Sequence, residues 1–520
     1  MNALPTALSW ADWMEKQTNG GSSMDKTYIG IDMGTSGIKL LLIDASRQTL
    51  AQSSQEYEVA HPRAGWSQID PQIWYDAMMA GLKRLLAGQD GRQVGAIGVT
   101  GQMHTVVLLD EAGQSVRPAL MWNDKRTGDC IPVLRRTLAQ GPDGAYLSGI
   151  VSTGSPAANL YWMSREEPDL FRRVRRFLIG PDYLVYRLTG QAGTDYVEAS
   201  TSSLYSPTRR AWLDDMRTLI GLPEAAYPEV RGSGEVVGCV LSDIAVALGL
   251  GPDVRVIAGT GDNPATAIST GCLGGGYPVL SLGTSGVLMF PTPDLRADAK
   301  GKTILCSLDG RRFSYLVQGV VQSTGESINW WTRKVLGARD FGAMDGAITD
   351  AMIRESRVLF YPHINGDKTL YADPTLRGAF IGLSSDTGPE GMYYAVLEGL
   401  CLAFRQLAEG MHLDLSALPV LKVVGGGAKS DLWLQTLANV LNVRVERLSG
   451  AVGPAFGIAL LACAADHPDV RPESLTAGSL AIAKGFDPDP GLTALYRERY
   501  ARYLRIHDAL RYVDTGESPS

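Results

Sequence analysis

The sequence predicts an α/β protein of two duplicated domains around a central cleft. A chain of 520 residues is too long for one ordinary hydrophobic core. Apolar strand patterns alternate with amphipathic helix patterns, which is typical of α/β domains with mixed sheets. The tetrapeptide GTSG occurs twice, beginning at Gly34 and at Gly283, each time between two aliphatic runs. Internal duplication explains this repeat most simply, with one ligand held between the two halves.

In the first half, hydrophobic periodicity separates strands from helices. We expect a hairpin over 28–60, an amphipathic helix over 71–88, a buried strand run over 94–110, and a polar, turn-rich excursion over 188–206. A strand, a glycine turn and a helix then follow over 254–269.

The second half repeats this order. Residues 278–291 predict strand, turn and strand, 326–337 and 392–411 predict helices, and 420–442 predicts strand, triple glycine and helix. We therefore place an N-terminal domain at 24–270 and a C-terminal domain at 271–510. Residues 1–23 form a flexible extension and 511–520 a tail.

Composition excludes several classes of protein. The net charge of −7 is unfavourable for a nucleic-acid binder, and Arg172, Arg173, Arg175 and Arg176 fit a solvated helix face better than a phosphate track. The six cysteines form no CxxC pair, and no HExxH occurs, which excludes a disulfide framework and the common zinc motifs. The longest apolar run, near 455–465, is too short to span a bilayer, and the first 23 residues lack the regions of a secretory signal. We expect a cytoplasmic protein with reduced thiols, no membrane partner, and an oligomeric state for which a homodimer is plausible.

The two GTSG turns can bind an anion. Glycine lets backbone N–H groups approach a phosphate closely, and Thr35, Ser36, Thr284 and Ser285 add hydroxyl donors. One copy is better explained as a plain hairpin turn. Two copies in equivalent contexts favour a pair of clamps on a triphosphate. The P-loop and dinucleotide motifs do not fit, because Lys429 follows Ala428 directly and Pro264 breaks the GxGxxG spacing.

Two aspartates come at strand ends. Asp32 would be costly to desolvate without a cation or good donors, so hydrated Mg²⁺ is its natural partner in a phosphate cleft. The competing interpretation is a turn aspartate that caps the hairpin. Asp262 can either N-cap the following helix or accept a proton from a hydroxyl that attacks phosphorus, and both interpretations stay open.

Other motifs suggest a polyol pocket. Gln102 and His104 in GQMHT interrupt an apolar strand, although a lone histidine there is more often a satisfied core residue. In MWNDKR, Trp122 can cover a sugar face while Asn123 and Asp124 bind hydroxyls; a surface turn with an exposed ion pair is an equal alternative. Gly425–Gly427 precede a helix, so they can receive a nucleotide or simply make a tight turn.

Together these motifs resemble the FGGY family of carbohydrate kinases, on the sugar kinase–actin–heat-shock ATPase fold with its ribonuclease H-like domains. The resemblance runs from Tyr28 to about residue 510 and includes YIGIDMGTSGIK, VTGQMHTVVLLD, MWNDKR, TDYVEAS, GTGDNPATAI, SLGTSGV and VVGGGAKSDLWLQTLANVLN. Within the family, the chain is most similar to members that phosphorylate D-xylulose.

The resemblance implies a role for each motif. Asp262 is the implied catalytic base with Asn263 near the substrate, Met103 and His104 contact the sugar, and Asp32 organises Mg–ATP. The implied phosphate and nucleotide contacts are Gly34, Thr35, Ser36, Gly283, Thr284, Gly325, Asn329, Gly426, Gly427 and Ser430.

The chain also departs from the family pattern. Thr105 stands where glycine is common, which would narrow the sugar pocket, Asn159 stands where lysine is frequent, and 449–457 lacks the usual acid before GPA. Ribulose, gluconate or glycerol are therefore alternative substrates. An actin- or chaperone-like ATPase is the alternative from another class, but it has no need of GQMHT, MWNDKR or GTGDN.

Overall fold

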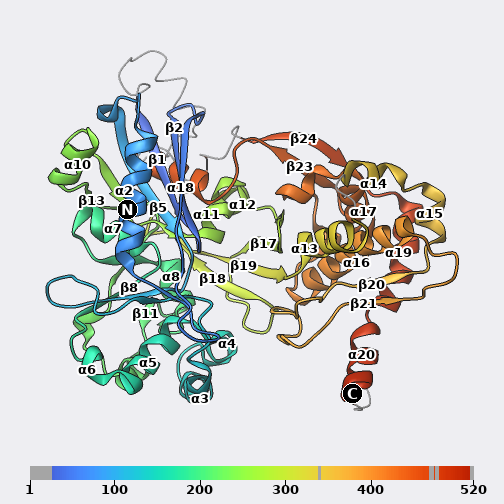
Figure 1. Cartoon of the computed structure of the whole chain (residues 1–520), viewed down its shortest axis with the longest axis horizontal. Helices are drawn as coiled ribbons and strands as arrows, with labels where there is room; N and C mark the ends of the chain where they lie inside the picture. The colour runs from blue at the N-terminus through green and yellow to red at the C-terminus, as the bar shows by residue number, and fades with distance from the viewer. Residues whose placement is uncertain (1–25, 338–340, 468–473, 475–479, 516–520) are drawn as a thin grey trace, which may run out of the picture.

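The computed structural model describes residues 26–337, 341–467, 474 and 480–515 and shows two lobes joined by a layer of helices (Figure 1). The predicted N-terminal extension, 1–23, lies outside the described residues, as do 516–520 of the predicted tail. Residues 511–515 belong to helix α20 (Ile506–Thr515). Within the described part of the chain, no helix is both long and apolar enough to cross a membrane.

The first large sheet contains the predicted hairpin. Its strand order is β13-β14-β5-β1-β2-β3, with β15 also paired to β5. Strand β1 runs antiparallel to β2 and parallel to β5, and β5 runs parallel to β14 and β15. The strands are β1 (Thr27–Met33), β2 (Gly37–Asp44), β3 (Thr49–Glu56), β5 (Val94–Gly101), β13 (Val236–Cys239), β14 (Arg255–Ile257) and β15 (Thr260–Gly261).

The second large sheet repeats this topology. Its order β19-β17-β16-β22-β23-β24 matches β3-β2-β1-β5-β14-β13, with the same parallel and antiparallel pairs. One strand has no counterpart: β18 extends the sheet beyond β19. The strands are β16 (Val279–Leu282), β17 (Gly286–Thr292), β18 (Lys302–Cys306), β19 (Ser314–Val321), β22 (Leu421–Val424), β23 (Val445–Ser449) and β24 (Ala481–Phe486). The duplication predicted from GTSG is present in the fold.

Alternating residues of β1 pack into different cores, as the strand period requires. Ile29 and Ile31 pack with α2 (Pro71–Leu85), α7 (Asp182–Thr189) and α10 (Ser242–Leu248), whereas Tyr28 faces α11 (Asp262–Ser269) and α18 (Pro454–Asp466). The outer face of the second sheet is covered by α16 (Pro389–Gly410), α17 (Asp431–Leu441) and α19 (Pro490–Tyr503).

Helix α18 lies between the two sheets, against β1, β5 and α11 (Figure 1). It carries the longest apolar run of the sequence, and a helix that is apolar on all sides belongs in a core. Its crossing with α11 needs glycine, because a Cβ on Gly457 would lie 1.9 Å from the carbonyl oxygen of Ala265. This crossing forms the interior between the lobes.

The predicted strand run 94–110 is two strands in different sheets. β5 ends at Gly101, and His104 has a left-handed φ of 72°, which redirects the chain into β6 (Val106–Leu109). β6 belongs to a four-stranded sheet with β4 (Gln68–Ile69), β7 (Ala119–Leu120) and β8 (Arg176–Ile179). The break falls at GQMHT, where Gln102 and His104 were expected to interrupt the apolar strand. Periodicity could not show that β6 joins another sheet, because both segments are buried and apolar.

The four arginines at 172–176 do not form a helix face, so that prediction was wrong. Helix α6 (Pro168–Phe171) ends before them, and they occupy an exposed turn and the first residue of β8. All four side chains are exposed, and two of them are paired, Arg172 with Asp169 and Arg173 with Asp110.

The remaining elements surround these sheets. In the N-terminal lobe they are α3 (Ile131–Gln140), α4 (Gly144–Ile150), α5 (Pro156–Glu166), α8 (Tyr196–Thr201), α9 (Asp214–Ile220), β9 (Gly193–Asp195), β10 (Tyr205–Ser206), β11 (Ala211–Trp212) and β12 (Glu229–Arg231). In the C-terminal half they are α12 (Cys272–Gly275), α13 (Thr324–Asn329) with its π-helical continuation Trp330–Val335, α14 (Phe341–Ala347), α15 (Asp350–Glu355), β20 (Leu359–Tyr361) and β21 (Ala379–Ile381).

Candidate active site

The strand register brings the two predicted catalytic aspartates to one edge of the first sheet. Met33 of β1 pairs with Gly101 of β5, and Gly101 pairs with Gly261 of β15. Because these strands are parallel, the residues at their carboxyl ends meet. Asp32 and Asp262 therefore flank the segment that follows β5.

These two carboxylates affect each other's charge. Burial, followed by the negative charge of Asp262, raises the pKa of Asp32 to about 7. Burial raises the pKa of Asp262 to about 6, opposed by hydrogen bonds from backbone N–H groups. Asp262 is thus mostly ionised at neutral pH and can accept a proton.

Asp262 is not the N-cap of α11. Gly261 occupies that position, and Asp262 is the first helical residue, where its Oδ1 accepts from the backbone N of Asn263 at 2.7 Å. The capping alternative is therefore wrong in its usual form, in which the side chain of the N-cap residue accepts from the backbone N–H two or three residues further along the helix.

Asp32 does not cap the first hairpin either. Among the described residues, no hydrogen-bond donor lies at its carboxylate oxygens, although the positive charge of Lys39, its partner across the β1–β2 pair, lowers its pKa. A half-buried acid without a donor, next to a second acid, fits a hydrated divalent cation.

The first GTSG turn is accessible and well supported. Its backbone closes through Gly34 N to Gly37 O at 2.9 Å, and the Tyr57 hydroxyl donates to Gly34 O. The indole Nε1 of Trp122 donates to Thr35 Oγ1 at 3.1 Å, while Ser36 is exposed. A cavity of about 360 Å³ opens beside the turn, lined by Thr35, Ser36, Tyr57, Glu58, Val59, His61 and Asn123.

The second GTSG turn is held by backbone groups. Gly325 N donates to Gly283 O at 3.0 Å and Glu326 N to Thr284 O at 3.3 Å, so the start of α13 lies on the turn. Asn329 is exposed one helical turn after Gly325. Within the described residues no hydrogen bond joins the two turns, and the clamp on one triphosphate stays a prediction.

The glycine run 425–427 lies directly behind the second turn. Gly425 has a φ of 97°, and a Cβ there would contact Leu282, the residue before Gly283. The Gly426 backbone faces open space. Ser430 N-caps α17 through Trp433 N, so its hydroxyl already has a structural role. The predicted nucleotide contacts of the C-terminal half thus form one group.

GQMHT lies against the end of β15. Gln102 N donates to Met33 O at 2.8 Å, and the Met103 side chain contacts Gly261, where a Cβ would lie 2.5 Å from Met103 Cγ. The Gln102 side chain is buried and its Oε1 has no partner. Thr105, which was expected to narrow the pocket, is fully buried, and its Oγ1 accepts from Trp122 N at 3.2 Å. This residue joins GQMHT to MWNDKR.

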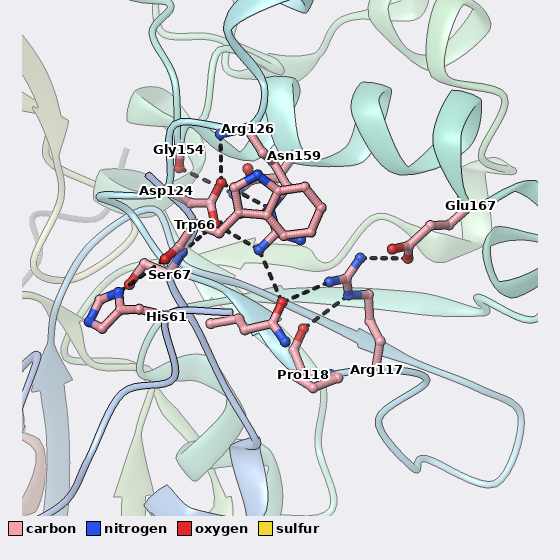
Figure 2. A network of polar contacts seen from close by, with 11 residues as sticks. His61, Trp66, Ser67, Arg117, Pro118, Asp124, Arg126, Gly154, Asn159 and Glu167 are labelled. Atoms are coloured by element: carbon pink, nitrogen blue, oxygen red, sulfur yellow. Dashed lines mark hydrogen bonds and ion pairs between the residues drawn. The ribbon is translucent and has the colours of Figure 1, made fainter. Parts of the chain in front are cut away.

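MWNDKR is held by a buried ionic network (Figure 2). Asp124 is fully buried and accepts from Ser67 N at 2.6 Å and from the Arg126 guanidinium at 2.8 Å. The Trp66 ring lies 3.8 Å from Arg126 Cζ and the Trp162 ring 5.2 Å from it. The ion pair predicted for a surface turn exists, but it is buried. Both Asp124 oxygens are engaged inside the protein, so its predicted sugar contact remains a prediction.

The same network extends along the four-stranded sheet (Figure 2). Gln68 Oε1 accepts from Arg126 and from Arg117, and Arg117 pairs with Glu167 at 2.5 Å. Asn159, the departure from the frequent lysine, donates to Gly154 O at 3.3 Å. These contacts fix the loop that places Trp122, a half-exposed side chain, beside Thr35.

The structure adds two charged residues that sequence reasoning missed. Glu198 of α8 is fully buried and accepts from His104 N at 3.3 Å; burial, with Asp195 and Asp182 nearby, raises its pKa well above the usual range. Lys302 of β18 places its Nζ 3.1 Å from His104 Nε2. TDYVEAS already resembled the family, which could have drawn attention to Glu198. No sequence pattern marked Lys302.

Two family models and several curated proteins match most of this chain. Residues 27–269 match the N-terminal domain of the FGGY family of carbohydrate kinases, and residues 279–465 match its C-terminal domain. The xylulose kinase of Escherichia coli (strain K12) is 31% identical over 486 residues, 93% of this chain and 99% of that protein. The xylulose kinase of Bacillus subtilis (strain 168) is 30% identical over 505 residues, 94% of this chain and 98% of that protein.

A solved structure shows the same architecture. The crystal structure of a xyloylose kinase from Brucella ovis superposes with a TM-score of 0.86 at 31% identity, covering 94% of this chain and all of that one (100%). The similarity therefore includes both lobes and the helices between them.

Proposed function

This chain belongs to the FGGY family of carbohydrate kinases and uses ATP to phosphorylate a sugar, and from that premise we propose that the sugar is D-xylulose, phosphorylated at its C5 hydroxyl. The choice of sugar is supported by the relatives named xylulose kinase, which match almost the whole chain. The chemistry is supported by Asp262, a half-buried, ionised carboxylate at a strand end beside the predicted sugar contacts.

In the proposed reaction, the C5 oxygen attacks the γ-phosphorus of ATP in line. The bond between the γ-phosphorus and the bridging oxygen breaks, ADP leaves, and the proton of the C5 hydroxyl passes to Asp262. A weak base suffices, because the hydroxyl loses its proton late in a loose transition state. The product is D-xylulose 5-phosphate.

We assign the other contacts by their position. Met103, His104, Trp122, Asn263 and Gln102 hold the sugar in the N-terminal lobe. The two GTSG turns, with Gly325, Asn329, Gly426, Gly427 and Ser430, hold ATP. Asp32 would hold Mg²⁺ through water, and the ion would supply positive charge against the phosphates.

The cellular setting follows from the substrates. An enzyme that uses ATP, with six free cysteines, fits a reducing compartment. We propose that it acts in the cytoplasm.

A sugar panel tests this proposal. ADP release is measured with D-xylulose, D-ribulose, L-ribulose, gluconate and glycerol at saturating Mg–ATP, with a no-sugar reaction as the baseline. We expect the highest kcat/KM with D-xylulose. Faster turnover of gluconate, glycerol or a ribulose would replace the proposed substrate while leaving the kinase chemistry in place.

A further inference from the structure

Strand β18 carries a residue of the C-terminal half into the sugar site of the N-terminal half. β18 packs against α8, where Leu305 N donates to Ser200 Oγ at 3.2 Å. It also contacts α4, where Thr303 N donates to the Tyr146 hydroxyl at 3.1 Å. Lys302, the first residue of the strand, is half-buried. These bonds hold its side chain beside His104.

The contact between Lys302 and His104 fixes the direction of a hydrogen bond. The two nitrogens, Lys302 Nζ and His104 Nε2, are 3.1 Å apart. An ammonium group has three donors and no acceptor, so Nε2 must accept. A neutral imidazole that accepts at Nε2 carries its proton on Nδ1.

The surroundings keep both groups in these states. Burial and the positive charge of Lys302 lower the pKa of His104 well below its usual range, so the ring is neutral. Burial lowers the pKa of Lys302 to about 8, which still leaves most of the amine protonated at neutral pH. Glu198 accepts from the His104 backbone N, which holds the residue in its left-handed conformation.

The Nδ1 atom of His104 is left without a partner. It is buried, and within the described residues no acceptor lies at hydrogen-bond distance. A buried donor without a partner destabilises the structure, so an acceptor on a bound ligand would restore the missing hydrogen bond. The proposed substrate supplies one in its carbonyl oxygen, which accepts and cannot donate.

We propose that Lys302 is a positioning residue that locks His104 as an Nδ1–H donor, and that this donor binds the carbonyl oxygen of a 2-ketose. The second part rests on the proposed function. The C-terminal half thereby selects the sugar, although the sugar site lies in the N-terminal half. A polyol has a hydroxyl at the same position, which can donate as well as accept. It can therefore bond to either tautomer of His104, and its affinity depends less on Lys302.

The tautomer of His104 is the direct test, and it needs no substrate. Full-length protein with [15N]histidine shows, for each ring, which nitrogen carries the proton, and the signals missing from H104Q assign His104 among the six histidines. We expect the proton on Nδ1 in the wild type and on Nε2 in K302M, which keeps the length of the side chain and removes its donors. A wild-type ring protonated at Nε2, or a K302M ring still protonated at Nδ1, would overturn the proposal.

The matched control is K368M. The positive charge of Lys368 also lowers the pKa of Lys302, but the Lys368 Nζ lies over the Trp122 ring, 5.4 Å from its centre. We expect its loss to leave the His104 tautomer unchanged. If K368M moves the proton to Nε2 as K302M does, general electrostatics and not the Lys302 hydrogen bond sets the tautomer, and the proposal fails.

Kinetics test the link to the sugar. We expect K302M to raise the KM for D-xylulose with a smaller change in kcat, and to lower the ratio of kcat/KM for D-xylulose over xylitol about tenfold. An unchanged ratio with a shifted tautomer would refute the carbonyl contact. If the panel above finds another substrate, the proposed function fails, whereas the tautomer result still decides the role of Lys302.

Discussion

The two large sheets share one topology, but they end in different chemistry. Two residues before the first GTSG stands Asp32, and two residues before the second stands Ser281. After β5 come Gln102 and His104, whereas its counterpart β22 is followed by three glycines. The same fold thus presents charged side chains at one edge and mostly backbone at the other.

This difference shows how a duplicated fold divides a reaction between its halves. A sugar hydroxyl must lose a proton and be oriented, which needs side chains such as Asp262 and His104. A nucleotide triphosphate carries its own charges and is well bound by glycine backbone and hydroxyls. The division between the two halves is not complete. β18, the one described strand of the second sheet without a counterpart, brings Lys302 of the C-terminal half to His104 of the N-terminal half.

The largest effect is expected when the proposed base, Asp262, is replaced. Asp262→Asn should lower kcat by about 10²–10⁴-fold, because the sugar hydroxyl loses its proton acceptor. Ser449→Ala, at the end of β23, the counterpart of β14, should stay within about threefold of wild type. Steady-state ADP release with D-xylulose measures both variants, and Mg–ATP binding by calorimetry should be preserved.

The pH profile supplies the control for this variant. Since the pKa of Asp262 is raised to about 6, wild-type kcat/KM should fall as pH drops below 6, where the carboxylate is protonated. The residual activity of Asp262→Asn should lack the part of this decrease that Asp262 causes and keep the part that comes from protonation of Asp32, whose pKa is raised to about 7. A near-wild-type rate in the variant would leave Asp262 with a structural role only.

Substitution of the two threonines compares the phosphate turns directly. Thr35→Val and Thr284→Val should each raise the KM for ATP about tenfold or more, since a hydrogen bond to a charged group contributes about 1.5–3 kcal/mol. Thr35→Val should cost more, because Thr35 also accepts from Trp122. Thr137→Val on α3 serves as the control. If only one turn affects the KM for ATP, the picture of two clamps on one nucleotide is wrong.

The smallest expected effect concerns stability. The pKa of Asp32 is about 7 in the folded protein and about 3.9 in the unfolded chain, so ionised Asp32 destabilises the folded state. This loss of folding free energy is absent below pH 4 and complete above pH 7. Asp32→Asn should therefore stabilise the protein without Mg²⁺ or nucleotide at pH 8, by about 2 kcal/mol after allowance for partial exposure, and have little effect near pH 4. Thermal unfolding at both pH values measures this.

Ser281→Ala is the matched variant in the second sheet. Because a hydroxyl does not titrate in this range, its effect on the melting temperature should be the same at both pH values. Equal pH dependence in the two variants would mean that Asp32 is not a strained acid.

Local patterns predicted much of the fold and the candidate site. The strand–turn–strand units at 27–44 and 279–292 were visible because strands and glycine turns are short-range features. The motifs around Asp32 and Asp262 were visible because polar residues directly after buried strands are unusual. One prediction failed at a local ambiguity, because the arginines at 172–176 follow a helix too short to recognise. The interruption of the strand run 94–110 at GQMHT was predicted, whereas its continuation in a different sheet was not.

The sequence by itself determined the duplicated α/β topology, the glycine turns and the identity of the acids at the strand ends, since these depend on neighbours in the chain. Only the tertiary structure decided which charges meet. Parallel strand register brought Asp32 beside Asp262, and the Arg126 network engaged both oxygens of Asp124. The extra strand β18 carried Lys302 to a histidine 198 positions away in the chain. Such contacts depend on how the two lobes pack, and side-chain periodicity carries no information on that packing.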